Sequence, residues 1–189
     1  MFYETPVLET ERLILKRGKA EDFVKVYEYD LTKLRNIAGE FEFVKQDPEK
    51  VKCFAEPYEN SYDWVMFLKS NNEPIGNVTA DREREDINSI ELAFNLHPNY
   101  WRKGYMSEAV IEIMNFLFEK GYDNIICGYD EGNFKSKGVG EKLGFIPFEV
   151  HENAWKKNGI PITSYVTILS KDRFYELYGK NLEEQHKTK

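Results

Sequence analysis

The sequence predicts one α/β or α+β domain built around a single mixed sheet. Two apolar segments, residues 62–68 and 75–80, flank the turn-forming string KSNNEP, which predicts an antiparallel hairpin. Further along, strand-like and helix-like segments alternate, which is typical of a sheet that also contains parallel pairing. The chain has 189 residues, 41% of them hydrophobic and 15% aromatic, which favours a packed core over disorder.

The N-terminal part predicts a strand followed by helices. The string ERLILKR, residues 11–17, is rich in Leu and Ile and predicts the first strand. The string KAEDFVKVYEYD follows it with apolar residues at helical spacing. Asp47 and Pro48 are residue types preferred at a helix N-cap and at the first helical position, so a further helix is expected there. The hairpin comes next.

The central part predicts a strand, a helix and a second strand. In INSIELAFNL, residues 87–96, the side chains alternate, which places Glu91, Ala93 and Asn95 on the face opposite the apolar residues. An amphipathic helix then runs from about Met106 and ends at Gly121. The string NIICGY, residues 124–129, predicts a buried strand.

The C-terminal part completes the predicted sheet. A helix is expected from about Phe134 to Gly144, followed by the strand FIPFEV, in which Pro147 indicates an edge or a bulge. The last strand, residues 162–170, precedes a last helix at 171–178. The result is a mostly antiparallel sheet of about six to seven strands flanked by helices. We expect a single domain over residues 1–180 and a polar C-terminal tail over 181–189.

Composition and charge exclude several classes of protein. The net charge of -7, from 26 basic and 33 acidic residues, argues against nucleic-acid binding and suits a cationic partner. No apolar run approaches the ~18 residues of a membrane span, and no signal peptide is recognised, so a cytoplasmic protein without a membrane partner is expected. The histidines and cysteines have no metal-ligand spacing, so no metal is expected.

The string NYWRKGYMSEAV, residues 99–110, has the ingredients of an anion site. It leads from a strand into a helix, whose first backbone N–H groups lack partners and carry a partial positive charge. Gly104 would let a phosphate approach the backbone, and Arg102 and Lys103 add charge. An ordinary charged turn with one glycine is an equally good interpretation of these residues. The P-loop string GxxxxGK[ST] and the dinucleotide string GxGxxG are both missing.

Four strings in a fixed order resemble one known superfamily. They are TERLIL, ELAFNLHP, YWRKGYMSEA and, about thirty residues on, NFKSKGVGEKLGF. Together they resemble the GCN5-related N-acetyltransferase (GNAT) superfamily, and most of all the branch that includes the ribosomal-protein N-terminal acetyltransferases. The resemblance extends from about Leu8 to Leu169 and implies the acyl-CoA N-acyltransferase (GNAT) fold.

The resemblance implies a site for acetyl-CoA. In the family's pyrophosphate loop, Trp101 takes the first position, Gly104 the required glycine, and Met106 a position usually held by Gly or Ala. The implied contacts are the backbone amides of Arg102, Lys103, Gly104, Tyr105, Met106 and Ser107 for the diphosphate, the strand edge at Phe94, Asn95 and Leu96 for the pantetheine arm, and Asn133 near the thiol. Lys135 and Lys137 would lie near the phosphates.

The transfer chemistry needs a base and an acid. Glu91 is the candidate base or amine-orienting carboxylate, although its place on a strand also fits a solvent-facing residue. Many family members carry a leaving-group Tyr where this chain has Gly140, so Ser136 is the candidate acid. A helix N-terminal hydroxyl without chemistry is the alternative for Ser136, and Tyr129 and Tyr165 are further candidates for the acid.

The resemblance implies an N-acetyltransferase that moves the acetyl group of acetyl-CoA to a primary amine by direct attack in a ternary complex. The acceptor is a protein N-terminus or a small-molecule amine, and segments 23–39, 40–59 and 150–161 are expected to select it, the last of them a loop carrying Trp155. A non-catalytic acyl-CoA-binding module is the alternative. A homodimer through an exposed last strand is also considered.

Overall fold

The domain is built on one eight-stranded sheet with the strand order β1-β2-β3-β4-β5-β6-β8-β7. The computed structural model describes residues 3–28, 47–56 and 59–186, with side chains as far as residue 179. The strands are β1 (Leu8–Glu9), β2 (Leu13–Lys16), β3 (Tyr62–Leu68), β4 (Pro74–Arg84), β5 (Ser89–Leu96), β6 (Asn124–Asp130), β7 (Ile146–Lys157) and β8 (Ile160–Ser170). Neighbouring strands are antiparallel except β5 and β6, which are parallel.

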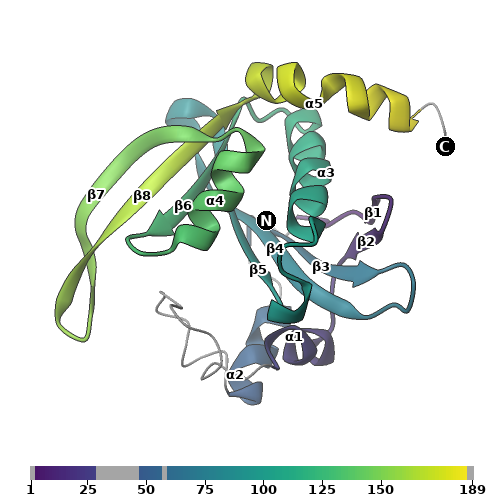
Figure 1. Ribbon diagram of the computed structural model, residues 1–189, viewed down its shortest axis with the longest axis horizontal. Coiled ribbons are helices and arrows are strands. Elements are labelled where there is room, and N and C mark those ends of the chain that lie inside the picture. Colours follow the sequence, from purple (N-terminus) through teal and green to yellow (C-terminus); the bar gives the residue numbers. More distant parts are fainter. Residues whose placement is uncertain (1–2, 29–46, 57–58, 187–189) are drawn as a thin grey trace.

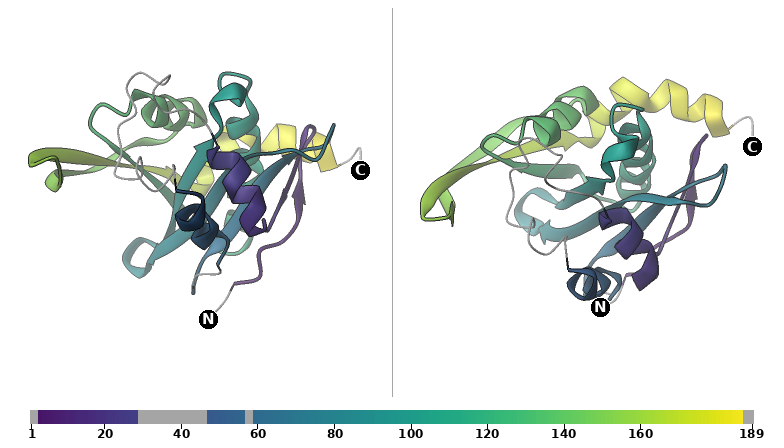
Figure 2. Two further views of the ribbon diagram at one scale, coloured as in Figure 1. Left: turned by 90° about the horizontal axis from the view of Figure 1, so that it is seen from below. Right: turned by 60° about the horizontal axis from the view of Figure 1, so that its bottom comes forward.

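Helices cover both faces of the sheet (Figures 1 and 2). They are α1 (Ala20–Tyr27), α2 (Pro48–Lys52), α3 (Tyr105–Glu119), α4 (Phe134–Leu143) and α5 (Lys171–His186), with short 3-10 turns at Cys53–Ala55, Glu85–Ile87 and Pro98–Tyr100. The main core joins α3, α4 and α5 to one face, and it includes Trp64, Leu92, Ile113 and Phe174. A smaller core joins α1 and α2 to the opposite face at β3.

The alternation predicted for residues 87–96 is confirmed. Ile90 and Leu92 lie in the main core, and Phe94 and Leu96 pack against it. Because successive side chains on a strand point to opposite faces, Glu91, Ala93 and Asn95 lie on the face away from α3. The strand therefore presents a polar row on one face and an apolar row on the other.

The predicted fold class is confirmed, with four differences in detail. The sheet has eight strands rather than six to seven, because the two-residue β1 has no periodic pattern of its own. The segment around Trp155, expected as a loop, is strand, since β7 continues to Lys157 and forms a long ribbon with β8 that projects from the domain (Figure 1). The last strand is not the edge of the sheet, because β8 lies between β6 and β7. The tail expected from residue 181 is helical as far as His186.

Some expectations fall on residues that the structure does not describe. Residues 29–46 lie outside the described ranges, so a part of each of the segments 23–39 and 40–59 expected to select the acceptor cannot be placed. In the described ranges, no helix is both long and apolar enough to cross a membrane.

The sheet separates between β5 and β6. The parallel ladder between these strands contains only the pairs Ser89↔Asn124, Ile90↔Ile125 and Glu91↔Ile126. Beyond Glu91, β5 continues to Leu96 and remains paired with β4, while β6 continues to Asp130 and remains paired with β8. Figure 1 shows the two strands diverging below the start of α3. This opening positions the candidate site.

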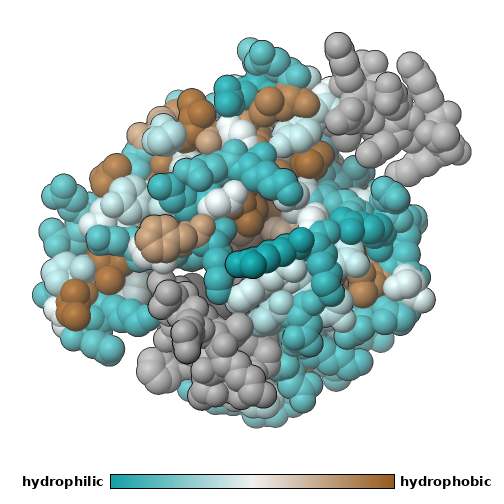
Figure 3. Space-filling model, viewed as in Figure 1, coloured by the Kyte–Doolittle hydropathy of each residue, from teal (hydrophilic) through white to brown (hydrophobic). Residues whose placement is uncertain are grey.

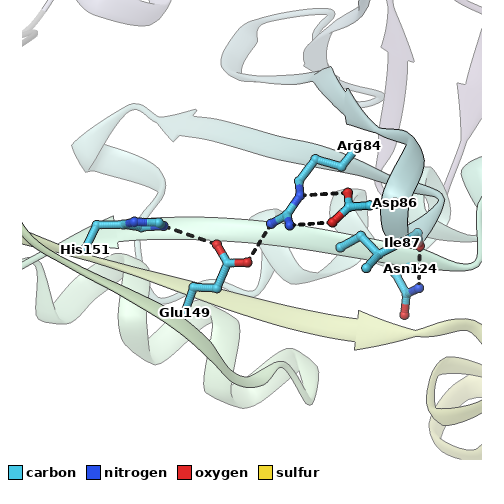
Figure 4. A network of polar contacts seen from close by, with 6 residues as sticks. All are labelled: Arg84, Asp86, Ile87, Asn124, Glu149 and His151. Carbon is cyan, nitrogen blue, oxygen red and sulfur yellow. Dashed lines mark hydrogen bonds and ion pairs between the residues drawn. The ribbon is translucent and has the colours of Figure 1, made fainter.

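An ion-pair network joins the end of β4 to the edge strand β7 (Figure 4). The Arg84 guanidinium contacts both carboxylate oxygens of Asp86, at 3.3 and 2.9 Å, and Oε1 of Glu149 at 2.8 Å. Glu149 also contacts Nε2 of His151 at 3.2 Å. Hydrogen bonds from Arg84 lower the pKa of Asp86 and of Glu149 below their ordinary values. The network holds the base of the β7–β8 ribbon against the body of the sheet.

We expect Arg84→Gln to lower the midpoint of thermal unfolding at pH 7. A carboxylate whose pKa is lower in the folded protein stabilises the fold above its unfolded pKa and loses that contribution as pH falls through the folded pKa. The difference between the variant and the natural protein should therefore shrink as the pH falls below the ordinary pKa values of Asp and Glu and the two carboxylates become protonated in the folded protein. Lys137→Gln, which breaks an exposed pair with Glu141 within α4, is the control and should change little at either pH. An equal loss at both pH values would assign the effect to packing of Arg84 on Phe148 instead.

Candidate active site

The turn before α3 leaves the start of that helix open. Gly104 is the N-cap residue and has φ +83°, and Arg102 has φ +62°. Within the described chain, no side chain caps α3, whereas Asp47 caps α2 and Asn133 caps α4. The first backbone N–H groups of a helix without such a cap remain available to an anion. The start of α3 therefore has the uncapped N–H groups that the expected anion site would need.

Met106 does not obstruct this helix start. Its side chain is 6% exposed and belongs to the main core beneath α3. The side chain thus points away from the turn, and only its backbone lies at the open end of the helix. The flexible thioether packs within the main core.

Trp101 ties the turn to both sides of the opening. Its Nε1 donates a hydrogen bond to the carbonyl oxygen of Leu96, 2.7 Å away, at the end of β5. The Nζ of Lys135, in the first turn of α4, lies 3.8 Å from the centroid of the indole ring. Trp101 therefore spans the gap between the free end of β5 and the start of α4.

Positive charge is concentrated around the turn. Desolvation lowers the pKa of Lys135, and the charge of Arg102 lowers it further. The charges of Lys135 and Arg102 repel each other, and an anion bound between them would stabilise the charged form of Lys135. Lys103 lies over the ring of Tyr100, at 5.3 Å. In Figure 3, the centre of this face of the molecule is an apolar area bordered by hydrophilic side chains.

Glu91 lies where β5 and β6 separate. Its side chain is 24% exposed, and its Oε2 is 3.4 Å from Arg82. Its Oε1 lies close to β6, since a Cβ added at Gly128 would be 3.4 Å from it. Desolvation raises the pKa of Glu91 above its ordinary value; Arg82 opposes this shift, and the charge of Asp81, its cross-strand partner, adds to it. The carboxylate is thus held in a partly buried position with a raised proton affinity.

Asn133 and Ser136 lie together at the start of α4. The side-chain oxygen of Asn133 accepts a hydrogen bond from the backbone N–H of Ser136 at 3.2 Å, so Asn133 is the N-cap of the helix. Gly140 is buried one turn further on, and a Cβ there would make ordinary contacts with Phe145 and Thr167. Tyr129 and Tyr165 stack at 5.2 Å on the neighbouring strands.

Contacts of Trp101 link three of the elements that carry the predicted residues. The turn before α3, the free end of β5 and the start of α4 surround the opening in the sheet, and Glu91 marks its inner end. Sequence reasoning missed Asp81, which faces Glu91 across the ladder, and Arg12 and Glu108, whose contacts hold the turn. Arg12 lies within the TERLIL string and Glu108 in the first turn of α3, but neither position signals such a contact without the structure. In the described ranges no cluster of side chains could hold a metal ion.

Comparison with known proteins identifies the family. The model of the acetyltransferase (GNAT) domain matches residues 12–146, which is more than half of the chain and includes every element of the candidate site. The chain belongs to the GNAT acetyltransferase family. The resemblance inferred from the four sequence strings is confirmed.

Individual relatives agree with this assignment. The uncharacterized N-acetyltransferase YoaA of Bacillus subtilis is 23% identical over 175 residues, which cover 89% of this chain and 98% of YoaA. The ribosomal-protein-S5-alanine acetyltransferase of Vibrio fischeri has a similar structure, with a TM-score of 0.68 and 20% identity over 89% of this chain and 98% of that one. The microcin C7 self-immunity acetyltransferase MccE, whose structure contains acetyl-CoA and AMP, has a TM-score of 0.69 and 14% identity over 85% and 93%. The expected fold and class of enzyme, an acetyltransferase, are thus confirmed.

We expect Gly104→Ala to weaken the binding of CoA by at least about tenfold, equivalent to ~1.4 kcal/mol. A Cβ at Gly104 would be 3.3 Å from a terminal nitrogen of Arg12, and the left-handed backbone there costs a side chain about 1–2 kcal/mol. Isothermal titration calorimetry with CoA measures the affinity.

Gly159→Ala is the matched control for this variant. Gly159 has nearly the same φ, +82°, but no atom lies within 4 Å of an added Cβ, and it sits at the tip of the β7–β8 ribbon. Both variants should lose similar stability, and only Gly104→Ala should lose affinity. Equal CoA binding by the two variants would show that the turn does not hold the cofactor.

Proposed function

We propose that this acetyltransferase moves the acetyl group of acetyl-CoA to a primary amine by direct attack within a ternary complex. The observation that carries the proposal is the uncapped start of α3, which lies beside Arg102 and Lys135 at the opening between β5 and β6. This combination offers backbone donors and positive charge for a diphosphate at one end of the opening. At the other end of the opening, it offers the edge of β5 to an extended chain.

The residues fit acetyl-CoA as a substrate. We assign the diphosphate to the backbone amides of residues 102–107 and the pantetheine arm to β5 at Phe94, Asn95 and Leu96, beyond the last residue of this strand that pairs with β6. Trp101 supports both contacts because it links Leu96 to the turn. Lys135 adds charge beside the diphosphate, whereas Lys137 is paired with Glu141 on the surface of α4.

Glu91 is assigned to the amine. An amine attacks only in its neutral form, although a free alkyl ammonium has a pKa near ~10.4 and an α-ammonium one near ~7.7–8.0. Glu91 and Asp81 place negative charge on the face opposite α3, which attracts the ammonium form. The raised pKa of Glu91 makes its carboxylate a stronger base than an exposed one, so it can accept the proton directly or through water.

The transfer step then needs a stabilised oxyanion and a protonated leaving group. The amine nitrogen forms a bond to the thioester carbon, and the carbonyl oxygen takes the negative charge, which a backbone N–H at Phe94–Leu96 stabilises. When the C–S bond breaks, the thiolate leaves with the electron pair and takes a proton from the Ser136 hydroxyl. The attacking nitrogen, which carries one proton too many after the bond forms, gives that proton up to restore the hydroxyl, so the products are the neutral amide and the free thiol of CoA. Asn133 supports this role because it fixes the backbone of Ser136 at the start of α4. The stacked pair Tyr129 and Tyr165 is the alternative source of the proton.

A covalent acetyl-enzyme intermediate is disfavoured by the environment of the nearest thiol. Cys127 is buried, and desolvation, with a further contribution from the charge of Glu91, raises its pKa to about 12. A thiol nucleophile reacts as the thiolate, which this environment suppresses. Direct attack by the amine is therefore the mechanism that the site supports.

A non-catalytic acyl-CoA-binding module is the competing function, because Gly140 replaces the usual Tyr acid. Release of free CoA from acetyl-CoA, measured with a panel of small amines and N-terminal peptides, separates the two functions. We expect turnover with at least one primary amine. Saturable CoA binding without turnover on any amine, up to pH ~9 where α-amines are neutral, would support the binding module instead.

We expect Glu91→Gln to lower kcat/KM about 10²-fold at pH 7, since it removes the base and leaves the shape of the side chain. A base works when it is ionised, so the activity of the natural protein should fall as pH drops through the raised pKa of Glu91. The amine substrate titrates identically in assays of the natural protein and of Glu91→Gln. The ratio of the two kcat/KM values therefore reports the ionisation of Glu91 alone. This ratio should approach one at acidic pH. A ratio of kcat/KM that does not change with pH would show that Glu91 does not act as the base.

A further inference from the structure

Arg12 and Glu108 form a compact set of contacts behind the open start of α3. Glu108 lies in the first turn of this helix, and its side chain is 18% exposed. Its Oε1 accepts hydrogen bonds from the backbone N–H of Arg12 at 2.8 Å and from Oγ1 of Thr10 at 2.5 Å. Its Oε2 lies 2.6 Å from both Nε and a terminal nitrogen of Arg12. Both carboxylate oxygens are thus occupied by the turn that joins β1 to β2.

The same guanidinium also contacts the turn before α3 on both sides of Gly104. A terminal nitrogen of Arg12 donates to the carbonyl oxygen of Lys103 at 3.0 Å. The guanidinium carbon lies 4.3 Å from the centroid of the Tyr105 ring. These contacts fix the direction of the peptide groups that enter the helix, whose N–H groups form the proposed anion site.

The negative charge of Glu108 lies close to the proposed anion site at the start of α3. A carboxylate in the first turn of a helix interacts favourably with the helix dipole and therefore competes with a bound anion. It also repels a second anion at the same helix end. Arg12 cancels this charge and turns the carboxylate towards β1 and β2, away from the open N–H groups.

We propose that Arg12 is a positioning residue for the diphosphate of the acyl-CoA substrate, acting through Glu108 and the carbonyl of Lys103. This inference rests on the proposed function, because it needs the diphosphate at the start of α3. Arg12 screens the Glu108 carboxylate and holds the peptide groups at 103–105 in the binding geometry. Glu108 in turn holds Arg12 in place.

Compensation of the Glu108 charge by Arg12 predicts a specific pattern of CoA affinities among variants. Arg12→Gln leaves the Glu108 carboxylate uncompensated at the helix end, so CoA binding should weaken at least about tenfold. Adding Glu108→Gln to this variant removes the repulsion and should recover at least about fivefold of the loss. In the natural background, Glu108→Gln should change the affinity by less than about threefold in either direction. Arg12 already compensates the Glu108 charge, and the amide oxygen of Gln can still accept a hydrogen bond from Arg12 and hold it in place.

Titration calorimetry with CoA and with pantetheine tests this pattern on the full chain. Pantetheine lacks the diphosphate, so its dissociation constant should change by less than about twofold in every variant. Arg12→Lys keeps the charge without the planar fork and should fall between the natural protein and Arg12→Gln. Lys52→Gln, which breaks an exposed ion pair with Glu49 within α2, on the opposite face of the sheet, controls for general loss of a surface pair. Thermal unfolding shows that each variant is folded at the titration temperature.

The outcomes separate this inference from the proposed function. If the natural protein binds CoA and Arg12→Gln binds it equally well, the positioning role is wrong and the proposed function stands. If the double variant is as weak as Arg12→Gln, or if pantetheine affinity falls in parallel with CoA affinity, Arg12 does not act through the Glu108 charge and the inference is overturned. If the natural protein does not bind CoA, both the inference and the proposed function fail.

Discussion

The structure depends on a helix end that the chain leaves without an internal partner. In the described residues, α2 and α4 begin with a side-chain cap, but α3 begins at Gly104 with its first N–H groups uncapped. An uncapped helix start carries a partial positive charge that favours an anion. Three residues hold the start of α3 in position. Met106 packs in the core, Trp101 donates a hydrogen bond to β5, and Arg12, from the β1–β2 turn, donates a hydrogen bond to the carbonyl of Lys103.

The separation of β5 from β6 converts this helix end into a two-sided site. Positive groups at Arg102 and Lys135 lie on the side of α3 and α4, and the carboxylates of Asp81 and Glu91 lie on the opposite face of the sheet. An anionic donor and a cationic acceptor would thus approach the opening from opposite faces and meet near its inner end. The net charge of -7 favours the cationic acceptor in addition.

Most of the fold could be predicted from the sequence because the patterns that indicate its strands and helices are local. The period of two in residues 87–96, the period of three to four after Met106 and the turn string KSNNEP each predicted an element that the structure contains. Strand β1 and the length of β7 were missed, since pairing partners far away in the chain define them and no pattern in the strand itself does. The positions of the site residues followed from family strings. The contacts of Arg12 with Glu108 could not be predicted, because they join residues 96 positions apart.

We propose that the backbone of residues 102–107 holds the diphosphate of the acyl-CoA substrate. NMR of the ¹⁵N-labelled protein can follow its amide resonances during titration with CoA and then with pantetheine. We expect CoA to shift the amides of residues 102–107 more than any others, and pantetheine to leave them nearly unchanged. If CoA binds and these amides do not shift, the diphosphate lies elsewhere.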